Sequence, residues 1–270
     1  MQIGIFAKTF PGTDPATVLK ASRAAGFDGV HYNMACSDLD PMPDALTRRQ
    51  TAAVAAATRA TGQQIYAVSG TWNMIHPDPA VRTAGHRRLA VLAASAAAMG
   101  TNLITLCTGT RDPADQWRPH NDNTSPEAWA DLLTAFEAAI AIADQHDILL
   151  GVEPELANVV NSAAAARRLI DQMQSKRIRI VLDPANLFEV DPDPRDLIER
   201  ATDLLADRLI MAHAKDRAPD GSFATAGKGV IDFGHFLGRL KAAGFTGPVV
   251  THGLTAGEAA TVAALLRSLI

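Results

Sequence analysis

Short apolar segments alternate with longer, alanine-rich segments of helical periodicity along the whole chain of 270 residues. This alternation is typical of parallel strands that are connected by helical crossovers. Eight segments have the character of strands, and they cover residues 3–7, 29–33, 64–70, 102–109, 148–155, 178–184, 208–214 and 248–252. Eight strand–helix units predict an α/β fold of the (β/α)₈ TIM-barrel type, in a single domain that spans residues 1–270.

Capping residues and glycines mark where the predicted helices begin and end. Four helix starts carry a capping residue followed by proline, namely Asp14-Pro15, Asp78-Pro79, Ser125-Pro126 and Asp193-Pro194. The capping oxygen accepts a hydrogen bond from an otherwise unpaired backbone amide, and proline suits the first helical position. Glycine stands at the helix ends in the similar segments AAGFDGV (24–30) and AAGFTGPVV (242–250), where left-handed backbone angles are needed.

A doubly wound open sheet is the alternative architecture, because the number of strands is what separates it from a barrel at this level. No linker, low-complexity tract or shift in composition divides the chain. The first strand is not followed by a G-x-G-x-x-G fingerprint, which disfavours a dinucleotide site.

Charge and composition favour a small-molecule partner. The formal net charge is −4 and no block of lysine or arginine occurs, so a nucleic acid is not expected as a partner. Cys36 and Cys107 are too few for a disulfide scaffold, which fits a reducing compartment. No apolar run reaches the roughly 18 residues of a membrane span, and no signal peptide is recognisable. We therefore expect a cytoplasmic protein without a membrane partner, and the sequence leaves open whether it forms a homo-oligomer.

Polar side chains stand where the last four barrel strands are predicted to end. These residues are Glu153, Asp183, His213 and His252, and successive members are 30, 30 and 39 residues apart, about one strand–helix unit each. Active sites of such barrels lie at the carboxyl ends of the strands, so the four side chains are expected to converge. Taken singly, each one is also compatible with a helix cap, a salt bridge or a turn.

Strand alternation places these four side chains toward the barrel interior. Two positions before each of them stands a small or apolar residue, namely Gly151, Val181, Met211 and Val250. Two carboxylates and two imidazoles that converge in an apolar funnel need a compensating charge, because unpaired buried charge costs several kcal/mol. We therefore predict one divalent metal ion as cofactor, with Mn²⁺, Mg²⁺, Co²⁺ and Zn²⁺ all compatible with the mixed ligand set.

Several segments of the sequence resemble the xylose-isomerase-like family of sugar isomerases and epimerases. They are VSGTWNMIHPD (68–78), GVEPE (151–155), VLDPANLF (181–188), AHAKD (212–216), AGKGVIDF (226–233) and AAGFTGP (242–248). The resemblance implies a TIM barrel of carbohydrate metabolism that binds one divalent metal through Glu153, Asp183, His213 and a fourth ligand. The family usually has glutamate at the fourth position, where this chain has His252, and Asn186 stands where a substrate-binding histidine often occurs.

The expected reaction is proton transfer next to the carbonyl of a sugar, sugar phosphate or related hydroxy-ketone, through a metal-stabilised enediolate. Glu153 is the first candidate for the base, and Glu155 is an alternative proton carrier or a hydrogen-bond partner of a ligand. His252 is expected to bind metal and is a candidate to return the proton.

Six further residues are candidates for substrate binding, and each also has a purely structural interpretation. Lys215 shares the inward face with His213 and can bind a substrate oxygen or pair with Asp216 or another carboxylate. The other five stand in predicted loops and are Asn186, Arg217, Trp72, His76 and Arg111.

Three alternative functions share the predicted scaffold. A dehydratase of polyols or inososes begins with the same proton abstraction, and a barrel that binds sugar without catalysis is compatible with the missing fourth carboxylate. A phosphodiesterase that resembles apurinic-site endonucleases needs a multi-metal cluster with additional histidines. A metal-dependent isomerase or epimerase of a small carbohydrate remains the main hypothesis.

Overall fold

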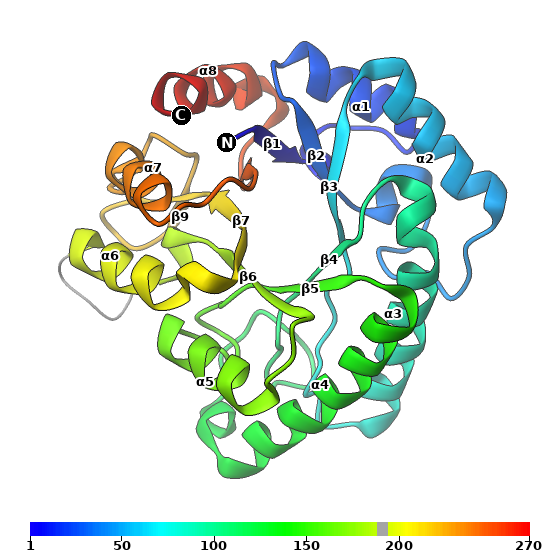
Figure 1. The fold of residues 1–270 in the computed structure, drawn as a ribbon, viewed down its shortest axis with the longest axis vertical. Helices are drawn as coiled ribbons and strands as arrows, with labels where there is room; N and C mark the ends of the chain where they lie inside the picture. Colours follow the sequence, from blue (N-terminus) through cyan, green and yellow to red (C-terminus); the bar gives the residue numbers. More distant parts are fainter. Residues whose placement is uncertain (188–193) are drawn as a thin grey trace.

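Eight parallel strands close into a barrel in the computed structural model, which describes residues 1–187 and 194–270 (Figure 1). The strand order around the barrel is β1-β10-β7-β6-β5-β4-β3-β2, so β10, the last barrel strand along the chain, pairs with β1. The bounds are β1 Ile3–Phe6, β2 Gly29–Tyr32, β3 Gln64–Ser69, β4 Leu103–Leu106, β5 Leu149–Val152, β6 Ile178–Leu182, β7 Leu209–Ala214 and β10 Val249–Thr251. The predicted (β/α)₈ barrel is confirmed, and closure excludes the open sheet.

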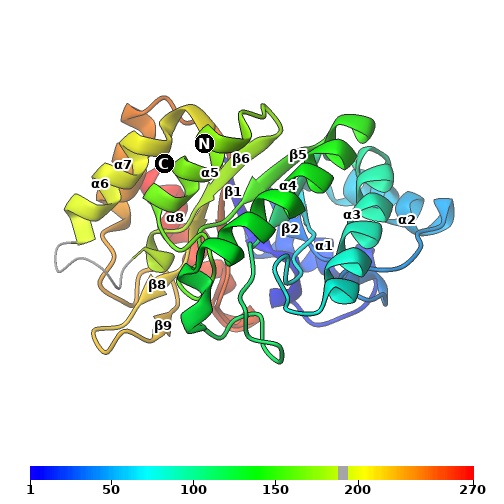
Figure 2. The ribbon, with the colours of Figure 1, turned by 90° about the horizontal axis from the view of Figure 1, so that it is seen from below.

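Eight helices within the described residues surround the barrel (Figures 1 and 2). Their bounds are α1 Pro15–Ala24, α2 Arg48–Thr61, α3 Pro79–Met99, α4 Pro126–His146, α5 Ala163–Met173, α6 Pro194–Leu205, α7 Phe233–Ala242 and α8 Ala259–Leu269. The side chains of Asp14, Asp78 and Ser125 each cap the helix that follows, as predicted. Helix α6 begins at Pro194, and the predicted cap Asp193 lies outside the described residues.

Side chains from alternate positions fill the barrel interior. Ala67, Leu103, Val181, Met211 and Val250 form a buried cluster inside the barrel, and a larger cluster fills the space between the strands and the helices. In the pairing of β10 with β7, Val250 of this layer lies opposite His213, which is two residues beyond Met211. The layer forms a floor, and the positions two residues further along the strands open onto the carboxyl end of the barrel.

Most of the strands end earlier than the sequence suggested. The segment predicted for 102–109 is a strand only over Leu103–Leu106, and β5 ends at Val152. Gly109 has φ +81°, and Thr110 donates its backbone amide to the side chain of Asn73, so this segment leaves the sheet. Glu153, Asp183 and His252 therefore follow their strands directly, whereas His213 lies within β7.

A short antiparallel hairpin, which the strand pattern did not predict, follows β7. It consists of β8 (Asp216–Arg217) and β9 (Phe223–Ala224), and Figure 2 shows it beyond the end of the barrel strands. The fully buried carboxylate of Asp216 accepts hydrogen bonds of 2.8–3.0 Å from the backbone amides of Arg217, Gly227, Gly229 and Ile231. These bonds fix the segment AGKGVI against the hairpin and position Phe223 beside the barrel mouth.

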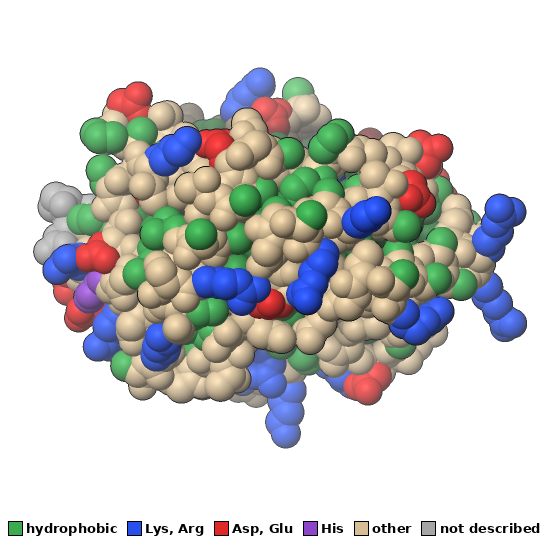
Figure 3. Space-filling model, turned by 90° about the horizontal axis from the view of Figure 1, so that it is seen from above, with side chains coloured by type: hydrophobic (Ala, Val, Ile, Leu, Met, Phe, Trp, Pro, Cys, Tyr) green, Lys and Arg blue, Asp and Glu red, His purple; other side chains and the backbone are tan. Residues whose placement is uncertain are grey.

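The outer surface carries charges of both signs. On the face drawn in Figure 3, lysine and arginine side chains are interspersed with acidic and neutral ones. In the described part of the chain, no helix is both long and apolar enough to cross a bilayer.

Candidate active site

The four predicted metal ligands converge at the carboxyl end of the barrel. One ligand atom from each of Glu153, Asp183, His213 and His252 lies within 4.8 Å of the others. Asp183 and His213 are buried, while Glu153 and His252 are partly exposed. Each side chain comes from a different strand end, of β5, β6, β7 and β10, so the closed barrel brings them together.

Each imidazole faces a carboxylate oxygen across the cluster. His213 Nδ1 lies 3.1 Å from Glu153 Oε1, and His252 Nε2 lies 3.1 Å from Asp183 Oδ2. A longer contact of 4.0 Å joins His213 Nδ1 to Asp183 Oδ2, and the two imidazole rings meet edge to face at 4.7 Å. One nitrogen or oxygen atom of each side chain therefore faces the same small volume.

The electrostatics of the cluster favour ionised carboxylates. Burial alone raises the pKa of Glu153, but the charge of His213 and its hydrogen bond lower that pKa overall. Burial likewise opposes ionisation of Asp183, whereas Lys215 and His252 hold its pKa far below the usual range. The pKa of His252 is lowered chiefly by burial, which keeps its imidazole neutral and able to bind a cation.

Asn186 and Lys215 support the cluster through hydrogen bonds and charge. The fully buried Asn186 donates from Nδ2 to Glu153 Oε1 at 2.8 Å and accepts at Oδ1 from Lys215 Nζ at 2.7 Å. Lys215 Nζ also lies 3.5 Å from Asp183 Oδ2. The structure thus places Asn186, which the sequence suggested as a substrate contact, against the carboxylate of Glu153, where it fixes the orientation of that group. The carboxylate partner of Lys215 is Asp183, rather than Asp216.

Arg217 lies beside the site rather than in it. Its Nε donates to the carbonyl oxygen of Ala185 at 2.8 Å, and its guanidinium stacks on Phe223 at 4.0 Å from the ring centroid. Lys215 Nζ lies 3.8 Å from the same ring centroid. The ring of Phe223 is therefore held by two cations, which ties the β8–β9 hairpin to the site.

A cavity of about 480 Å³ opens above the cluster, and we call it the mouth cavity. Glu153, His213, Lys215 and His252 line it, together with Glu155. Burial and the nearby Glu153 raise the pKa of Glu155 to about 7. A carboxyl group with this pKa can accept or donate a proton near neutral pH.

Three further residues, His31, Trp117 and Phe223, line the mouth cavity. His31 of β2 stacks on His213 at 5.9 Å between ring centroids, and its Nε2 lies 2.8 Å from Thr105 Oγ1. Its inward position follows from strand alternation, which is the signal that could have found it. Trp117 and Phe223, 50% and 51% exposed, line the rim. No periodic pattern marks either of these two residues in the sequence.

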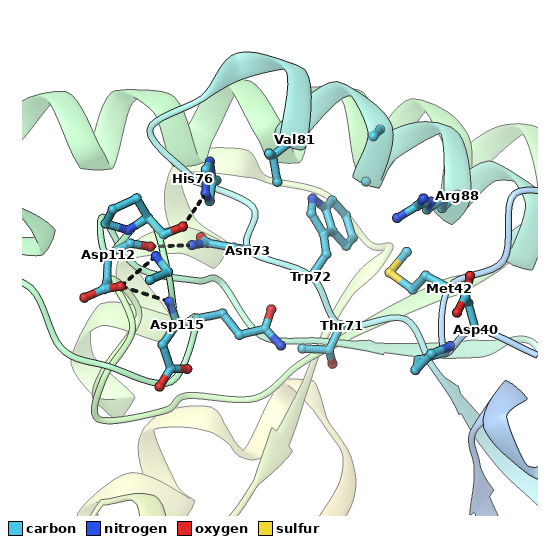
Figure 4. A pocket seen from close by; sticks show the side chains of 16 residues that line it. Asp40, Met42, Thr71, Trp72, Asn73, His76, Val81, Arg88, Asp112 and Asp115 are labelled. Carbon is cyan, nitrogen blue, oxygen red and sulfur yellow. Dashed lines mark hydrogen bonds between the residues drawn. The ribbon is translucent and has the colours of Figure 1, made fainter.

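Three other predicted substrate contacts lie away from the mouth cavity. Trp72 and His76 line a second cavity (Figure 4). Its other walls are formed by the segments that follow β2, β3 and β4 and by helix α3. Arg111 donates to the carbonyl oxygen of Ile75 at 3.0 Å and to Asp131 at 2.8 Å. The structure therefore uses Arg111 to tie the segment after β4 to the segment after β3 and to helix α4.

Gly85 of helix α3 allows Trp72 to pack closely, and its replacement by alanine is expected to destabilise the protein. An added Cβ would lie 2.0 Å from Trp72 Nε1. Overpacking of this kind costs about 1–3 kcal/mol, which outweighs the gain of about 0.5–1 kcal/mol from better helix propensity. Urea unfolding measures the difference. Gly238→Ala in α7, where a Cβ meets nothing within 4 Å, is the matched control and should be stabilising. An equal increase in the free energy of unfolding for Gly85→Ala would contradict the close contact between Gly85 and Trp72.

The closed barrel and its cluster define the class of α/β barrels with a polar site at the carboxyl ends of the strands. The family model for the xylose isomerase-like TIM barrel matches residues 19–269. The chain belongs to this family. No curated protein matches its sequence.

Solved structures with low sequence identity share the fold. A 3-keto-D-glucoside 4-epimerase from E. coli is 19% identical over 99% of each chain, with a TM-score of 0.80. An L-ribulose 3-epimerase is 19% identical over 97% of this chain and 86% of its own, with a TM-score of 0.74. A probable 3-DHS dehydratase from Bacillus anthracis is 12% identical over 99% of each chain, with a TM-score of 0.76.

Proposed function

We propose that the protein is a divalent-metal-dependent isomerase or epimerase of a sugar, sugar phosphate or related hydroxy-ketone. The observation that carries this proposal is the convergence of four ligand atoms within 4.8 Å of one another at the base of an accessible cavity. The similar structures that are named as sugar epimerases support a carbohydrate substrate.

The donor set fits a divalent cation. Two carboxylate oxygens and two imidazole nitrogens provide the mixed oxygen and nitrogen ligands that Mn²⁺, Co²⁺ and Zn²⁺ accept, and the mouth cavity leaves room for substrate oxygens. When bound, such an ion supplies Lewis-acid stabilisation of the negative charge that develops on a substrate carbonyl oxygen.

The residues of the chain then divide the proton transfer between them. Glu153 is the proposed base, because it faces the mouth cavity and Asn186 fixes its carboxylate. His252 lines the mouth cavity beside Asp183 and is the candidate to return a proton as well as to serve as a ligand. Glu155, with a pKa of about 7, is the alternative proton carrier. Lys215 is positioned to bind a substrate oxygen, since it lines the cavity while paired with Asp183.

Deuterium exchange tests this function. Incubation with D-allulose, L-ribulose or 3-keto-D-glucose in heavy water is expected to place deuterium on the carbon next to the carbonyl, as detected by NMR. Treatment with EDTA should stop the exchange, and added Mn²⁺ should restore it, because the cation stabilises the charge created by proton removal. Turnover of any of these sugars without deuterium incorporation would point to a hydride shift and contradict the proton-transfer proposal.

A dehydratase is the second candidate, favoured by the similarity to the probable 3-DHS dehydratase. It shares proton abstraction next to a carbonyl but ends with loss of water. Mass spectrometry of the product separates the two, because isomerisation leaves the mass unchanged and dehydration lowers it. A barrel that binds sugar without catalysis would hold metal and exchange no proton.

A further inference from the structure

The cavity beside the mouth cavity has the size and the walls of a ligand site. This side cavity has a volume of about 640 Å³, which lies in the usual range for small-molecule sites. It lies on the β2–β4 side of the barrel, whereas the four-ligand cluster lies on the side of β5, β6, β7 and β10. None of the four ligands contributes to its walls.

The two cavities adjoin one another. Pro41, Thr71 and Gln116 line both of them, and they come from the segments that follow β2, β3 and β4. The two cavities therefore meet at these three residues, which is where a molecule whose reacting carbon lies at the cluster would enter the side cavity. A single sugar ring in the mouth cavity leaves the side cavity unused.

The walls of the side cavity suit a ring with one apolar face and several hydroxyl groups. Figure 4 shows the indole of Trp72 between Val81 and Met42, with His76 and Asp112 to one side. The indole is held in place because Gly85 leaves room for it against helix α3. Aromatic and apolar surface next to a few polar groups is the usual composition of a small-molecule site.

The charges of the side cavity disfavour an anionic group. Three carboxylates line it, those of Asp40, Asp112 and Asp115, against one arginine. The carboxylate of Asp112 is paired with Arg118 at 3.4 Å, so the excess negative charge is that of Asp40 and Asp115. The lining arginine, Arg88, already donates to both carboxylate oxygens of Asp44, at 2.9 and 3.3 Å. A phosphate or sulfate would meet net negative charge here, whereas a neutral sugar ring would not.

We propose that the side cavity binds a neutral glycosyl substituent of the substrate, so that the protein binds a glycosylated keto sugar more tightly than a free or phosphorylated monosaccharide. This inference rests on the proposed function for the reacting end of the substrate. Binding energy from the remote ring would serve to hold the reacting carbon at the cluster.

Isothermal titration calorimetry tests this assignment with D-fructose and with three disaccharides that carry glucose on O3, O4 or O6 of fructose. At least one disaccharide is expected to bind about tenfold more tightly than fructose. Ala84→Phe, which adds a ring at the wall of the side cavity, should remove this gain. Ala94→Phe, at an exposed position of the same helix, should retain it.

Equal binding of fructose and all three disaccharides would overturn the inference, as would a gain that survives in Ala84→Phe. Tighter binding of fructose 6-phosphate than of every disaccharide would overturn the neutral assignment. Circular dichroism establishes that both variants are folded. Deuterium exchange on the same sugars tests the proposed function separately. If a disaccharide binds more tightly than fructose, Ala84→Phe removes this difference and no sugar exchanges deuterium, the side cavity is supported and the isomerase is contradicted. If the sugars exchange deuterium but no disaccharide binds more tightly than fructose, the isomerase is supported and the side cavity is contradicted.

Discussion

Glu153→Gln is expected to lower the rate of proton exchange by about 10²- to 10⁴-fold, the usual contribution of a general base. The amide keeps the shape of the side chain but cannot accept the proton. Asn186 donates to Glu153 Oε1 at 2.8 Å, so a glutamine can occupy the same position through its own carbonyl oxygen. The measurement is the initial rate of deuterium incorporation at saturating Mn²⁺, which compensates for weaker metal binding.

Glu155→Gln is the matched control for this substitution. Both glutamates line the mouth cavity, but only Glu153 belongs to the four-ligand cluster. A loss in Glu155→Gln that exceeds the loss in Glu153→Gln would show that the base is Glu155 and would contradict the assignment of Glu153.

Asp183→Ala is expected to have two large effects on stability. In the metal-free protein, the substitution leaves Lys215 without its carboxylate partner at 3.5 Å in a buried setting. Removal of one member of a buried ion pair costs about 3–5 kcal/mol. Urea unfolding in the presence of EDTA measures this loss. Asp44→Ala removes a surface carboxylate paired with Arg87 and Arg88, and it should change the free energy of unfolding far less, because exposed ion pairs contribute little.

The second effect concerns stabilisation by the metal. A ligand present at 100 times its Kd stabilises a folded protein by about 2.7 kcal/mol, provided that it does not bind the unfolded chain. Added Mn²⁺ should therefore raise the free energy of unfolding of the wild type and of Asp44→Ala, but not of Asp183→Ala. An equal increase in all three proteins would place the metal elsewhere.

The barrel and the ligand cluster could be predicted from the sequence because both follow from local repetition. Each strand is a short apolar run, and alternation along it places Val181 and Asp183, or Met211 and His213, on the same inward face. Once eight such strands close, residues at their carboxyl ends meet without further information. Proline and capping residues marked the helix starts for the same local reason.

The parts of the site that could not be predicted depend on contacts between distant segments. The β8–β9 hairpin has two residues per strand, too few for a periodic pattern, and it is held by Asp216 through four backbone amides. Asn186 is polar and follows a strand, so the sequence suggested a substrate contact. Its hydrogen bond to Glu153 is oriented by Lys215, 29 residues further along the chain.

The side cavity could not be predicted either, because it also depends on contacts between segments that are distant in the sequence. Trp72 and His76 were selected as residues of a substrate wall, but whether they face the cluster or a separate space depends on how the segments after β2, β3 and β4 pack together. These segments carry no periodic pattern, and Arg111, which joins two of them, resembles a substrate-binding arginine until its partners Ile75 and Asp131 are known.

Binding of Mn²⁺ to the metal-free protein tests the account most directly. Isothermal titration of the EDTA-treated wild type with Mn²⁺ should show one ion bound per chain, because one four-ligand cluster occurs in the described residues. Asp183→Ala should bind none, and His252→Ala should bind more weakly, since three ligands remain. Unchanged stoichiometry and affinity in both variants would contradict the assignment of this cluster as a metal site.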